Sequence, residues 1–375
     1  MKICHVTTVH TALDTRIFRR ECRSLVQAGH EVHLITNHDH ADTIDGVHLH
    51  ALPCGFRGWR RRILQTRLAF RMAAALRADI YQFHDPELLP WMAWLARRAV
   101  VVWDVHELYH ASIVQHNQLR WPWLSRWFSS AFGVMELLLA RRLAGIITAT
   151  PQLADRYRAL GPPVLVLRNL PDLSQVADLL GQAPVATDPV VVCSGTMAGR
   201  QLPELLQAMA LLRPRVPAAR LLMLSAFDTP EARLAVDCSI QSLGLEECVE
   251  ILPPRPFRDY IHLLAKRARV GVVLYERTPN NLAGIPNRLF EYWAAGLPVV
   301  ATATPNLSAY VEVNLAGTMV DSDSPQRIAD ALLPYLQDVA HAHNVGLRGR
   351  ASVVEDLNWS REFPRLMEFY GGLRS

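Results

Sequence analysis

The sequence predicts an α/β fold of two domains, each a doubly wound parallel β-sheet with helices on both faces. Short β-branched segments alternate with longer amphipathic ones, which is the pattern of strands joined by crossover helices. This alternation starts afresh near residue 190. The 375 residues fit two domains better than one, and 50% hydrophobic and 20% charged residues are typical of a globular protein.

The elements of the first half follow from this alternation. Strand 2–7 leads into a helix over 15–28 that ends at Gly29. Further strands are expected at 31–36, 80–83, 100–104, 145–149 and 164–167. Helices are expected at 58–77, 87–97 and 121–143.

The second half repeats the arrangement. Its strands are expected at 190–194, 220–224, 249–252, 270–274 and 298–301. Its helices are expected at 202–212, 230–243, 257–267 and 325–336. Two such sheets that face each other leave a deep cleft, and ligands of open α/β sheets bind at the carboxyl ends of the strands. The loops after strands are therefore where a site is expected.

These segments predict the domain boundaries. We expect an N-terminal domain over 1–168, an interdomain linker over 169–188 and a C-terminal domain over 189–356. The tail over 357–375 has the apolar spacing of a helix and is expected to pack back on the N-terminal domain.

Composition narrows the class of protein. A net charge of +4 gives no support for a nucleic-acid binder. The six cysteines form no C-x-x-C pair and are expected to be free thiols of a reducing compartment. The chain begins without a signal-peptide pattern and has no run of roughly 18 to 20 apolar residues. We therefore expect a cytoplasmic protein that is soluble or peripheral to the membrane.

The segment 284–301 is the most informative of the chain. It reads as a Gly/Pro loop, a helix and a β-branched strand, and the free backbone N–H groups that open such a helix suit a phosphate. Glu291 lies about two turns into the helix among apolar neighbours. After strand 190–194, the loop with Gly195 and Arg200 suits a diphosphate. The combination predicts a nucleotide-sugar site.

Asp14 and Arg16 follow the first strand. An arginine in the first turn of a helix is electrostatically unfavourable, which indicates a nearby anion for Arg16, either a ligand or Asp14 itself. Thr15 is the expected cap of this helix.

Two further strands of the first half end in polar clusters, namely His84-Asp85 and Asp104-Val-His106-Glu107. His106 can donate from one nitrogen to a sugar hydroxyl or a phosphate while Asp104 or a carbonyl fixes its tautomer. A purely structural histidine is the alternative.

Two patterns resemble metal sites. His84, Asp104 and His106 carry metal-ligating side chains, but their spacing matches no zinc pattern. Asp321-Ser-Asp323 resembles a D-x-D motif, yet Ser324-Pro325 is a helix start that explains Asp323 more simply. We expect no metal at either place.

Two regions predict a membrane-surface patch. The segment Arg57–Arg77 interleaves arginines with apolar residues, and Trp121–Phe128 is rich in aromatic residues. Together they are typical of a basic, amphipathic surface that binds lipid head groups. Some of the apolar residues in these two regions must belong to the hydrophobic core. Binding to nucleic acid is a weaker explanation of the arginine-rich segment than binding to a membrane.

The motifs together resemble the GT4 family of retaining glycosyltransferases, whose GT-B fold has two Rossmann-like domains facing a deep cleft. The chain looks most like bacterial members that build cell-surface polysaccharide. The resemblance spans nearly the whole chain and rests on Asp14–Phe18, His84–Pro86, Asp104–Glu107, Gly195-Thr196, Pro286–Tyr292 and the tail helix.

The resemblance implies roles for individual residues. His106 matches the cleft histidine that contacts the donor sugar. Glu291 matches the second glutamate of the family's E-x7-E motif, which holds the nucleotide ribose, and Arg200 matches a basic residue on the donor diphosphate. The loop that faces the donor phosphates would include Gly284, Ile285, Pro286 and Asn287, with Gly195 and Thr196 from the other loop. The acceptor side would comprise Asp14, Arg16, His84, Asp85 and Glu107.

Two positions depart from the family pattern. The first glutamate of E-x7-E falls at Ala283, and the basic residue often found after Gly195 is replaced by Thr196. Glu276 is a possible substitute for the lost acid. Some relatives lack that acid, so these departures do not by themselves indicate an inactive protein.

The resulting prediction is a glycosyltransferase at the inner face of the cytoplasmic membrane. It would move a sugar from a UDP- or GDP-linked donor to a hydroxyl of a lipid-linked glycan, with retention and without a cofactor or a metal. A nucleotide-sugar epimerase of the same fold is one alternative. A non-catalytic partner subunit of a polysaccharide assembly complex, motivated by Ala283 and Thr196, is the other.

Overall fold

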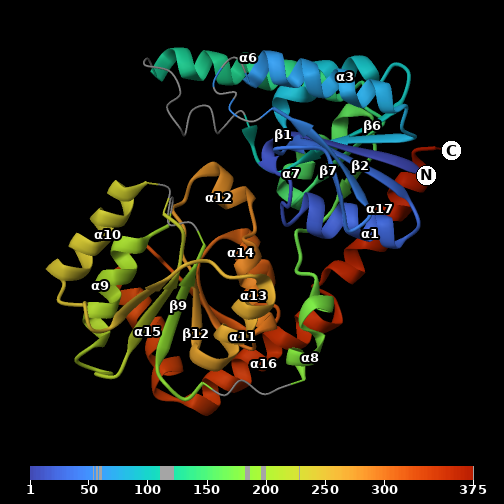
Figure 1. The fold of residues 1–375 in the computed structure, drawn as a ribbon. Coiled ribbons are helices and arrows are strands. Elements are labelled where there is room, and N and C mark those ends of the chain that lie inside the picture. Colours follow the sequence, from blue (N-terminus) through green and yellow to red (C-terminus); the bar gives the residue numbers. More distant parts are fainter. Residues whose placement is uncertain are drawn as a thin grey trace. The chain divides into compact units, whose positions relative to one another are not determined.

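The computed structural model describes residues 1–374 except 54, 56–57, 59–60, 110–121, 182–185, 196–199 and 228, and it describes only the backbone of 61 and 122–126. The described residues form two compact units, each with its own sheet (Figure 1). Unit 1 comprises Met1–Asn169 and Trp359–Ser375, and unit 2 comprises Leu170–Asn358.

Unit 1 contains an eight-stranded sheet in the order β3-β4-β2-β1-β5-β6-β7-β8. All neighbouring strands are parallel except the pair β3–β4. The strands are β1 (Lys2–Thr11), β2 (Glu31–Asn37), β3 (Asp42–Ile44), β4 (Val47–Leu52), β5 (Ile80–Phe83), β6 (Val100–Val105), β7 (Gly145–Thr148) and β8 (Val164–Val166).

Helices cover both faces of this sheet. Side chains of α3, α4 and α6 bury one face, and those of α1 and the tail helix α17 bury the other. Figure 1 shows α3 and α6 on one side of the strands and α1 and α17 on the other. The helices are α1 (Arg23–Gln27), α3 (Thr66–Leu76), α4 (Leu89–Leu95), α6 (Pro122–Ala140), α7 (Pro151–Asp155) and α17 (Trp359–Gly372).

Unit 2 contains a six-stranded, all-parallel sheet in the order β11-β10-β9-β12-β13-β14. The order turns back at β9, which lies between β10 and β12, so the loop after β9 is at the switch point where open α/β sheets bind ligands. The strands are β9 (Val190–Ser194), β10 (Arg220–Leu224), β11 (Val249–Leu252), β12 (Val270–Val273), β13 (Val299–Thr302) and β14 (Gly317–Val320).

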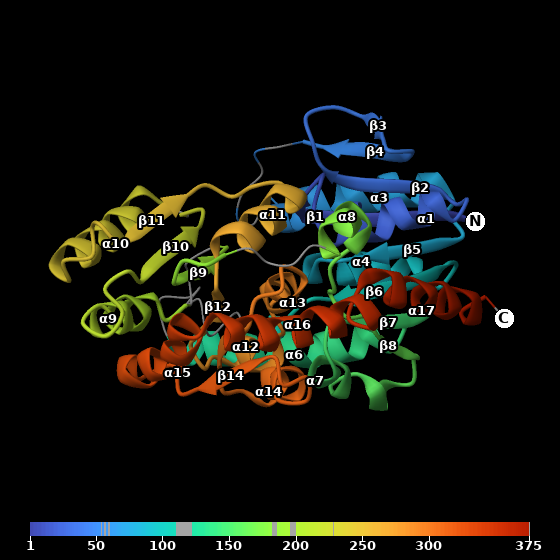
Figure 2. The same ribbon diagram turned by 90° about the horizontal axis from the view of Figure 1, so that it is seen from below.

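The sheet of unit 2 is also covered on both faces. Helices α9, α10 and α15 pack on one face, and α11, α13 and α14 pack on the other, with the end of α16. Figure 2 shows these helices from below. The helices are α8 (Ala177–Leu180), α9 (Leu202–Leu212), α10 (Pro230–Ser242), α11 (Phe257–Arg267), α12 (Pro279–Ala283), α13 (Asn287–Ala294), α14 (Pro305–Val311), α15 (Pro325–Gln337) and α16 (Val339–Glu355).

The structure differs from the predicted elements in a few places. Strands β3, β4 and β14 were not predicted, and β3 and β14 lie at the edges of their sheets. The helix expected over 15–28 opens as a π-helical segment over Ile17–Cys22 and continues as α1. Asp14, not Thr15, caps it, since its carboxylate accepts from the backbone N–H groups of Arg16 and Ile17.

Within the described parts of the chain, no helix has both the length and the hydropathy needed to cross a bilayer.

Candidate active site

Asp104 is the centre of a hydrogen-bonded cluster in unit 1. It lies in β6 and is fully buried. Nε and Nη2 of Arg16 donate to its Oδ2 and Oδ1 at 2.9 and 2.8 Å. Nδ1 of His84 and Nε2 of His106 lie 3.1 and 2.9 Å from Oδ2. Burial raises the pKa of Asp104, but the charge of Arg16 and the two imidazole hydrogen bonds outweigh it and hold the pKa well below its usual range.

The ionised carboxylate fixes the tautomers of its neighbours. Because a carboxylate only accepts hydrogen bonds, the nitrogens of His84 and His106 that face Asp104 must carry protons. The Nδ1 atom of His106 is then the nitrogen left for a ligand. The side chain of His106 is 19% exposed, whereas Asp104 and His84 are fully enclosed. His106 is therefore the accessible end of the cluster.

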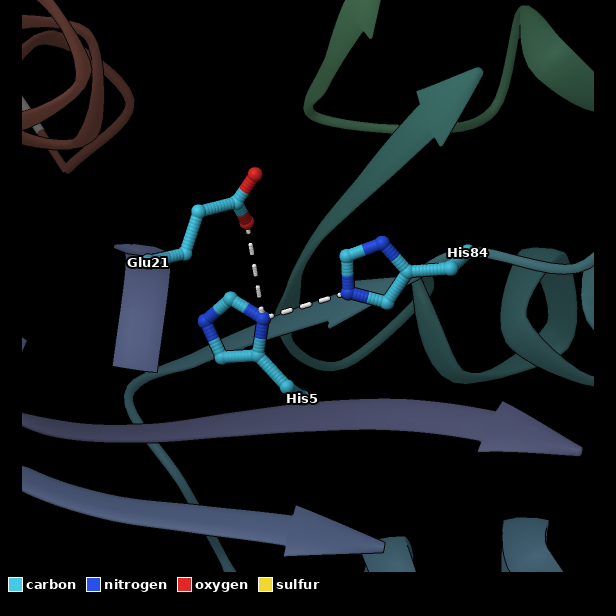
Figure 3. A group of neighbouring side chains, drawn as sticks. All are labelled: His5, Glu21 and His84. Carbon is cyan, nitrogen blue, oxygen red and sulfur yellow. Dashed lines mark hydrogen bonds and ion pairs between the residues drawn. The ribbon is translucent and has the colours of Figure 1, made fainter. Parts of the chain in front are cut away.

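The cluster continues inward through His5 and Glu21, which Figure 3 shows beside His84. Nδ1 of His5 lies 3.2 Å from Nε2 of His84 and 3.8 Å from Oε2 of Glu21. Burial and the neighbouring imidazole lower the pKa of His5 to about 3, and burial with the nearby Asp104 charge raises the pKa of Glu21 well above its usual range. Nε of Arg16 lies 3.2 Å from Oε1 of Glu21, so this arginine contacts two buried carboxyl groups, those of Asp104 and Glu21.

The same side chains do not suit a metal ion. Ligand atoms of His84, Asp104 and His106 lie within 4.8 Å of one another, as do those of His5, Glu21 and His84. Both oxygens of Asp104, however, already accept from Arg16, and Nε of Arg16 lies 3.2 Å from Oε1 of Glu21, so a divalent cation in either group would meet a guanidinium. The hydrogen bonds among these side chains explain why they lie close together, without a metal ion.

Asp85 anchors the end of β1. Its Oδ2 accepts from the hydroxyl of Thr7 at 2.9 Å and from the backbone N–H groups of Thr8 and Val9 at 2.5 and 3.2 Å. Nε2 of His10 lies 3.7 Å from its other oxygen. With 2% of its surface exposed, Asp85 holds the loop that borders the cluster.

The residues assigned to the acceptor side therefore divide into two groups. Arg16, His84 and Asp85 are buried, and the carboxyl groups that Arg16 contacts are those of Asp104 and Glu21 of the same unit. Asp14 is half-buried and Glu107 is exposed. Asp14, Glu107 and His106 are the members of the predicted set that a ligand can reach in unit 1.

In unit 2, the end of β9 carries a cationic site. Gly195 adopts a left-handed backbone with φ of 91°, which favours glycine, and a Cβ atom there would lie 2.6 Å from Nη2 of Arg200 and displace this guanidinium. Arg200 is 7% exposed, donates from Nη1 to the carbonyl of Ser194 and stacks 5.7 Å from the ring centre of Tyr275. Its Nε has no hydrogen-bond partner among the described residues.

Glu291 lies half-buried in α13, close to the tyrosines at the end of β9. The Ser194 hydroxyl bonds the hydroxyls of Tyr260 and Tyr292 at 2.7 and 2.9 Å, which ties the strand to α11 and α13. Burial, with a contribution from the charge of Glu291, raises the pKa of Tyr275 to about 12, so this tyrosine stays neutral.

The loop predicted to face the phosphates joins α12 to α13. Gly284 ends α12 and donates its N–H to the Asn280 carbonyl at 2.8 Å, while Ile285 and Pro286 form the connection. Asn287 begins α13, whose first turn has no side-chain cap. Thr196 lies outside the described residues, as do Arg57 and Trp121 of the predicted membrane patch.

The sequence did not identify Arg288, whose guanidinium lies beside that of Arg200. The sequence could have indicated Arg288 by the argument that was applied to Arg16, because both arginines lie in the first turn of a helix, where a positive charge is unfavourable. His5 and Glu21 were also missed, because a histidine inside an apolar strand carries no local mark of its partners.

Comparison with protein families gives two matches. Residues 15–170 match the family described as glycosyl transferase 4-like domain, and residues 188–338 match the glycosyl transferases group 1 family. A curated relative, the GDP-mannose-dependent alpha-(1-6)-phosphatidylinositol monomannoside mannosyltransferase of Mycobacterium tuberculosis, is 26% identical over 220 residues. The match covers 57% of this chain and 55% of the relative, so the chain spans about half the length of that protein.

Solved structures match over the whole chain. Sucrose-phosphate synthase from Thermosynechococcus elongatus has a TM-score of 0.75 and 17% identity, covering 100% of this chain and 99% of that one. HepE of Anabaena in complex with UDP-glucose has a TM-score of 0.71 and 15% identity, covering 99% and 100%. At such identities the likeness shows the fold, which is GT-B.

Proposed function

Because this chain belongs to the GT4 family of glycosyltransferases and has the GT-B fold, we propose that it transfers a sugar from a nucleoside diphosphate sugar to a hydroxyl, with retention of configuration. We further propose that the acceptor is a lipid-linked glycan of cell-surface polysaccharide synthesis, and that the donor is UDP- or GDP-linked. The M. tuberculosis relative is named as GDP-mannose-dependent and as acting on a lipid, and HepE is described with UDP-glucose, which supports this choice.

The observation that carries the proposal is the cationic end of β9. Arg200 is buried at the switch point of the sheet, with a guanidinium nitrogen that has no partner in the described part of the chain. A buried charge without a counter-ion is unfavourable, so an unpartnered guanidinium here indicates that the site binds an anion. A diphosphate fits, because charge-assisted bonds from arginine suit phosphate oxygens.

The proposed reaction needs no external base. The bond between the anomeric carbon and the donor phosphate oxygen breaks as the acceptor oxygen attacks from the same face. The acceptor proton passes to the departing phosphate oxygen. Arg200 stabilises the charge that develops on the diphosphate, and His106, held by Asp104, positions the donor sugar through its free nitrogen.

The donor site can be tested by nucleotide binding. We expect one of UDP, GDP, ADP, CMP and dTDP to raise the melting temperature equally with magnesium and with EDTA, because a ligand that binds only the folded state stabilises it. Glu291→Ala should weaken the affinity for that nucleotide about tenfold, since a hydrogen bond from a charged group contributes roughly 1.5 kcal/mol or more. A thermal-shift assay measures the melting temperature, and isothermal titration calorimetry measures the affinity.

The control is Glu312→Ala, which removes an exposed glutamate after α14 and should leave the affinity unchanged. If no nucleotide stabilises well-folded protein, the glycosyltransferase proposal fails and the non-catalytic partner subunit becomes the better account. Stabilisation that requires magnesium would contradict metal-independent binding of the donor.

A helix of unit 1 supports the membrane part of the proposal. Along α6, Trp127, Val134 and Leu138 are 62%, 59% and 55% exposed, and their spacing of seven and four residues places them on one face. Exposed Arg141 and Arg142 follow the helix directly. An apolar stripe that ends in cations is suited to a bilayer surface with anionic lipids.

The double substitution Trp127→Ser/Leu138→Ser should weaken binding to anionic phospholipid vesicles about tenfold or more, because each inserted side chain contributes roughly 1.5 kcal/mol or more. Nucleotide affinity should not change. Co-sedimentation with vesicles measures the effect, and Leu234→Ser, which removes a leucine of α10 that is 62% exposed, is the matched control. Equal sedimentation of all three proteins would remove the membrane assignment.

A further inference from the structure

Arg288 is a second cation at the proposed donor site. It lies in the first turn of α13, where the helix dipole disfavours a positive charge. Its guanidinium lies 5.4 Å from the ring centre of Tyr275. The side chain of Arg288 therefore extends from the start of α13 to the Tyr275 ring, on which the guanidinium of Arg200 also stacks.

The two guanidinium groups converge on one point. A Cβ atom added to Gly195 would lie 2.6 Å from Nη2 of Arg200 and 2.9 Å from Nη2 of Arg288, so both cations surround the same glycine at the end of β9. Nε of each arginine is buried and lacks a hydrogen-bond acceptor within the described residues.

Two like charges this close repel each other, and the stacking on Tyr275 offsets only part of that repulsion. An anion between the guanidinium groups would relieve this repulsion. A diphosphate supplies such an anion, with oxygens on both phosphates that arginine forks can reach.

We propose that Arg288 and Arg200 form a two-arginine clamp on the donor diphosphate, and that Arg288 supplies the cation that the chain lacks after Gly195, where Thr196 stands. The inference rests on the proposed function. During transfer, the departing diphosphate gains charge as its bond to the sugar breaks, and the clamp stabilises that charge. Arg288 is thus a catalytic residue contributed by α13 in place of one from the β9 loop.

The test compares diphosphate and nucleoside binding. The probes are UDP or GDP, whichever stabilises the wild-type protein, and the corresponding nucleoside, uridine or guanosine. Arg288→Gln should weaken diphosphate binding about tenfold to a hundredfold, as expected for loss of charge-assisted hydrogen bonds, and should leave nucleoside binding unchanged. Arg288→Lys should retain part of the diphosphate affinity, since it keeps the charge but loses the fork.

The matched control is Arg215→Gln, which removes an exposed arginine of unit 2 that pairs with Asp330 at 2.6 Å. Its diphosphate affinity should equal that of the wild type. The ligand-free Arg288→Gln protein should melt no lower than the wild type, because one of two repelling charges is gone. A purely structural Arg288 would instead lower the melting temperature and leave the diphosphate affinity unaltered.

The outcomes separate the two proposals. Unchanged diphosphate affinity in Arg288→Gln overturns the clamp while the donor site stands. Equal losses for diphosphate and nucleoside also overturn it, because they indicate a disturbed fold of the site. Absence of nucleotide binding in the wild-type protein overturns the proposed function itself.

Discussion

Replacing Asp104 with alanine is expected to lower the free energy of unfolding by about 3 kcal/mol, because the buried Arg16 loses its bidentate partner and keeps only the Glu21 carboxyl group at 3.2 Å. Arg16 is 6% exposed and both of its bonds to Asp104 would be lost. His84 and His106 would lose their common acceptor as well. Urea unfolding followed by far-UV circular dichroism measures the loss.

The mechanism of this loss can be checked with a second substitution. Arg16→Met added to Asp104→Ala should cause little further loss, since the charge left unpaired by the first change is removed by the second. Asp155→Ala is the control, because Asp155 pairs with Arg158 at the surface and exposed pairs contribute only about 0–1 kcal/mol. Additive losses for Arg16 and Asp104 would show that the pair is not coupled.

Substitution of His106 by alanine is expected to lower kcat about a hundredfold, the lower range for a positioned histidine at a reacting centre, while donor affinity changes little. His106 is the exposed member of the Asp104 cluster, and its Nε2 is held at 2.9 Å from the carboxylate. The alanine variant loses the nitrogen that we propose positions the donor sugar. Initial rates of nucleoside diphosphate release from the donor, with calorimetry of donor binding, separate the two quantities.

His48→Ala is the matched control for this change. His48 lies in β4, near the edge of the same sheet, is exposed, and bonds the Thr43 hydroxyl at 3.2 Å. Its kcat should equal that of the wild type. A His106→Ala enzyme with a normal kcat and a weaker donor affinity would place this histidine in ground-state binding only.

Much of the site could be located from the sequence, because strand ends and loop composition are local properties. Gly195 follows β9, His84 follows β5 and His106 follows β6, as the β-branched segments indicated. Glu291 lies on the helix that opens after the Gly284 loop. Their catalytic and binding roles stay predictions until the experiments above are done.

The partners of these residues could not be predicted in the same way. Arg16 lies beside Asp14 in the chain, yet its guanidinium meets Asp104, 88 residues away, because β1 and β6 flank β5 in the sheet. Asp85 stands in a loop that suits a ligand, yet it accepts hydrogen bonds from the end of β1. In both cases the strand order decides which side chains meet.

The sequence by itself determined that this protein is a two-domain parallel α/β protein resembling the GT4 glycosyltransferases, because periodicity, turn residues and short motifs are set by near neighbours in the chain. The tertiary structure alone decided which charges are free. It pairs Arg16 with Asp104 inside unit 1 and leaves Arg200 and Arg288 together without a described counter-ion in unit 2. The physical reason is that pairing depends on distance in space, which sheet order and burial fix.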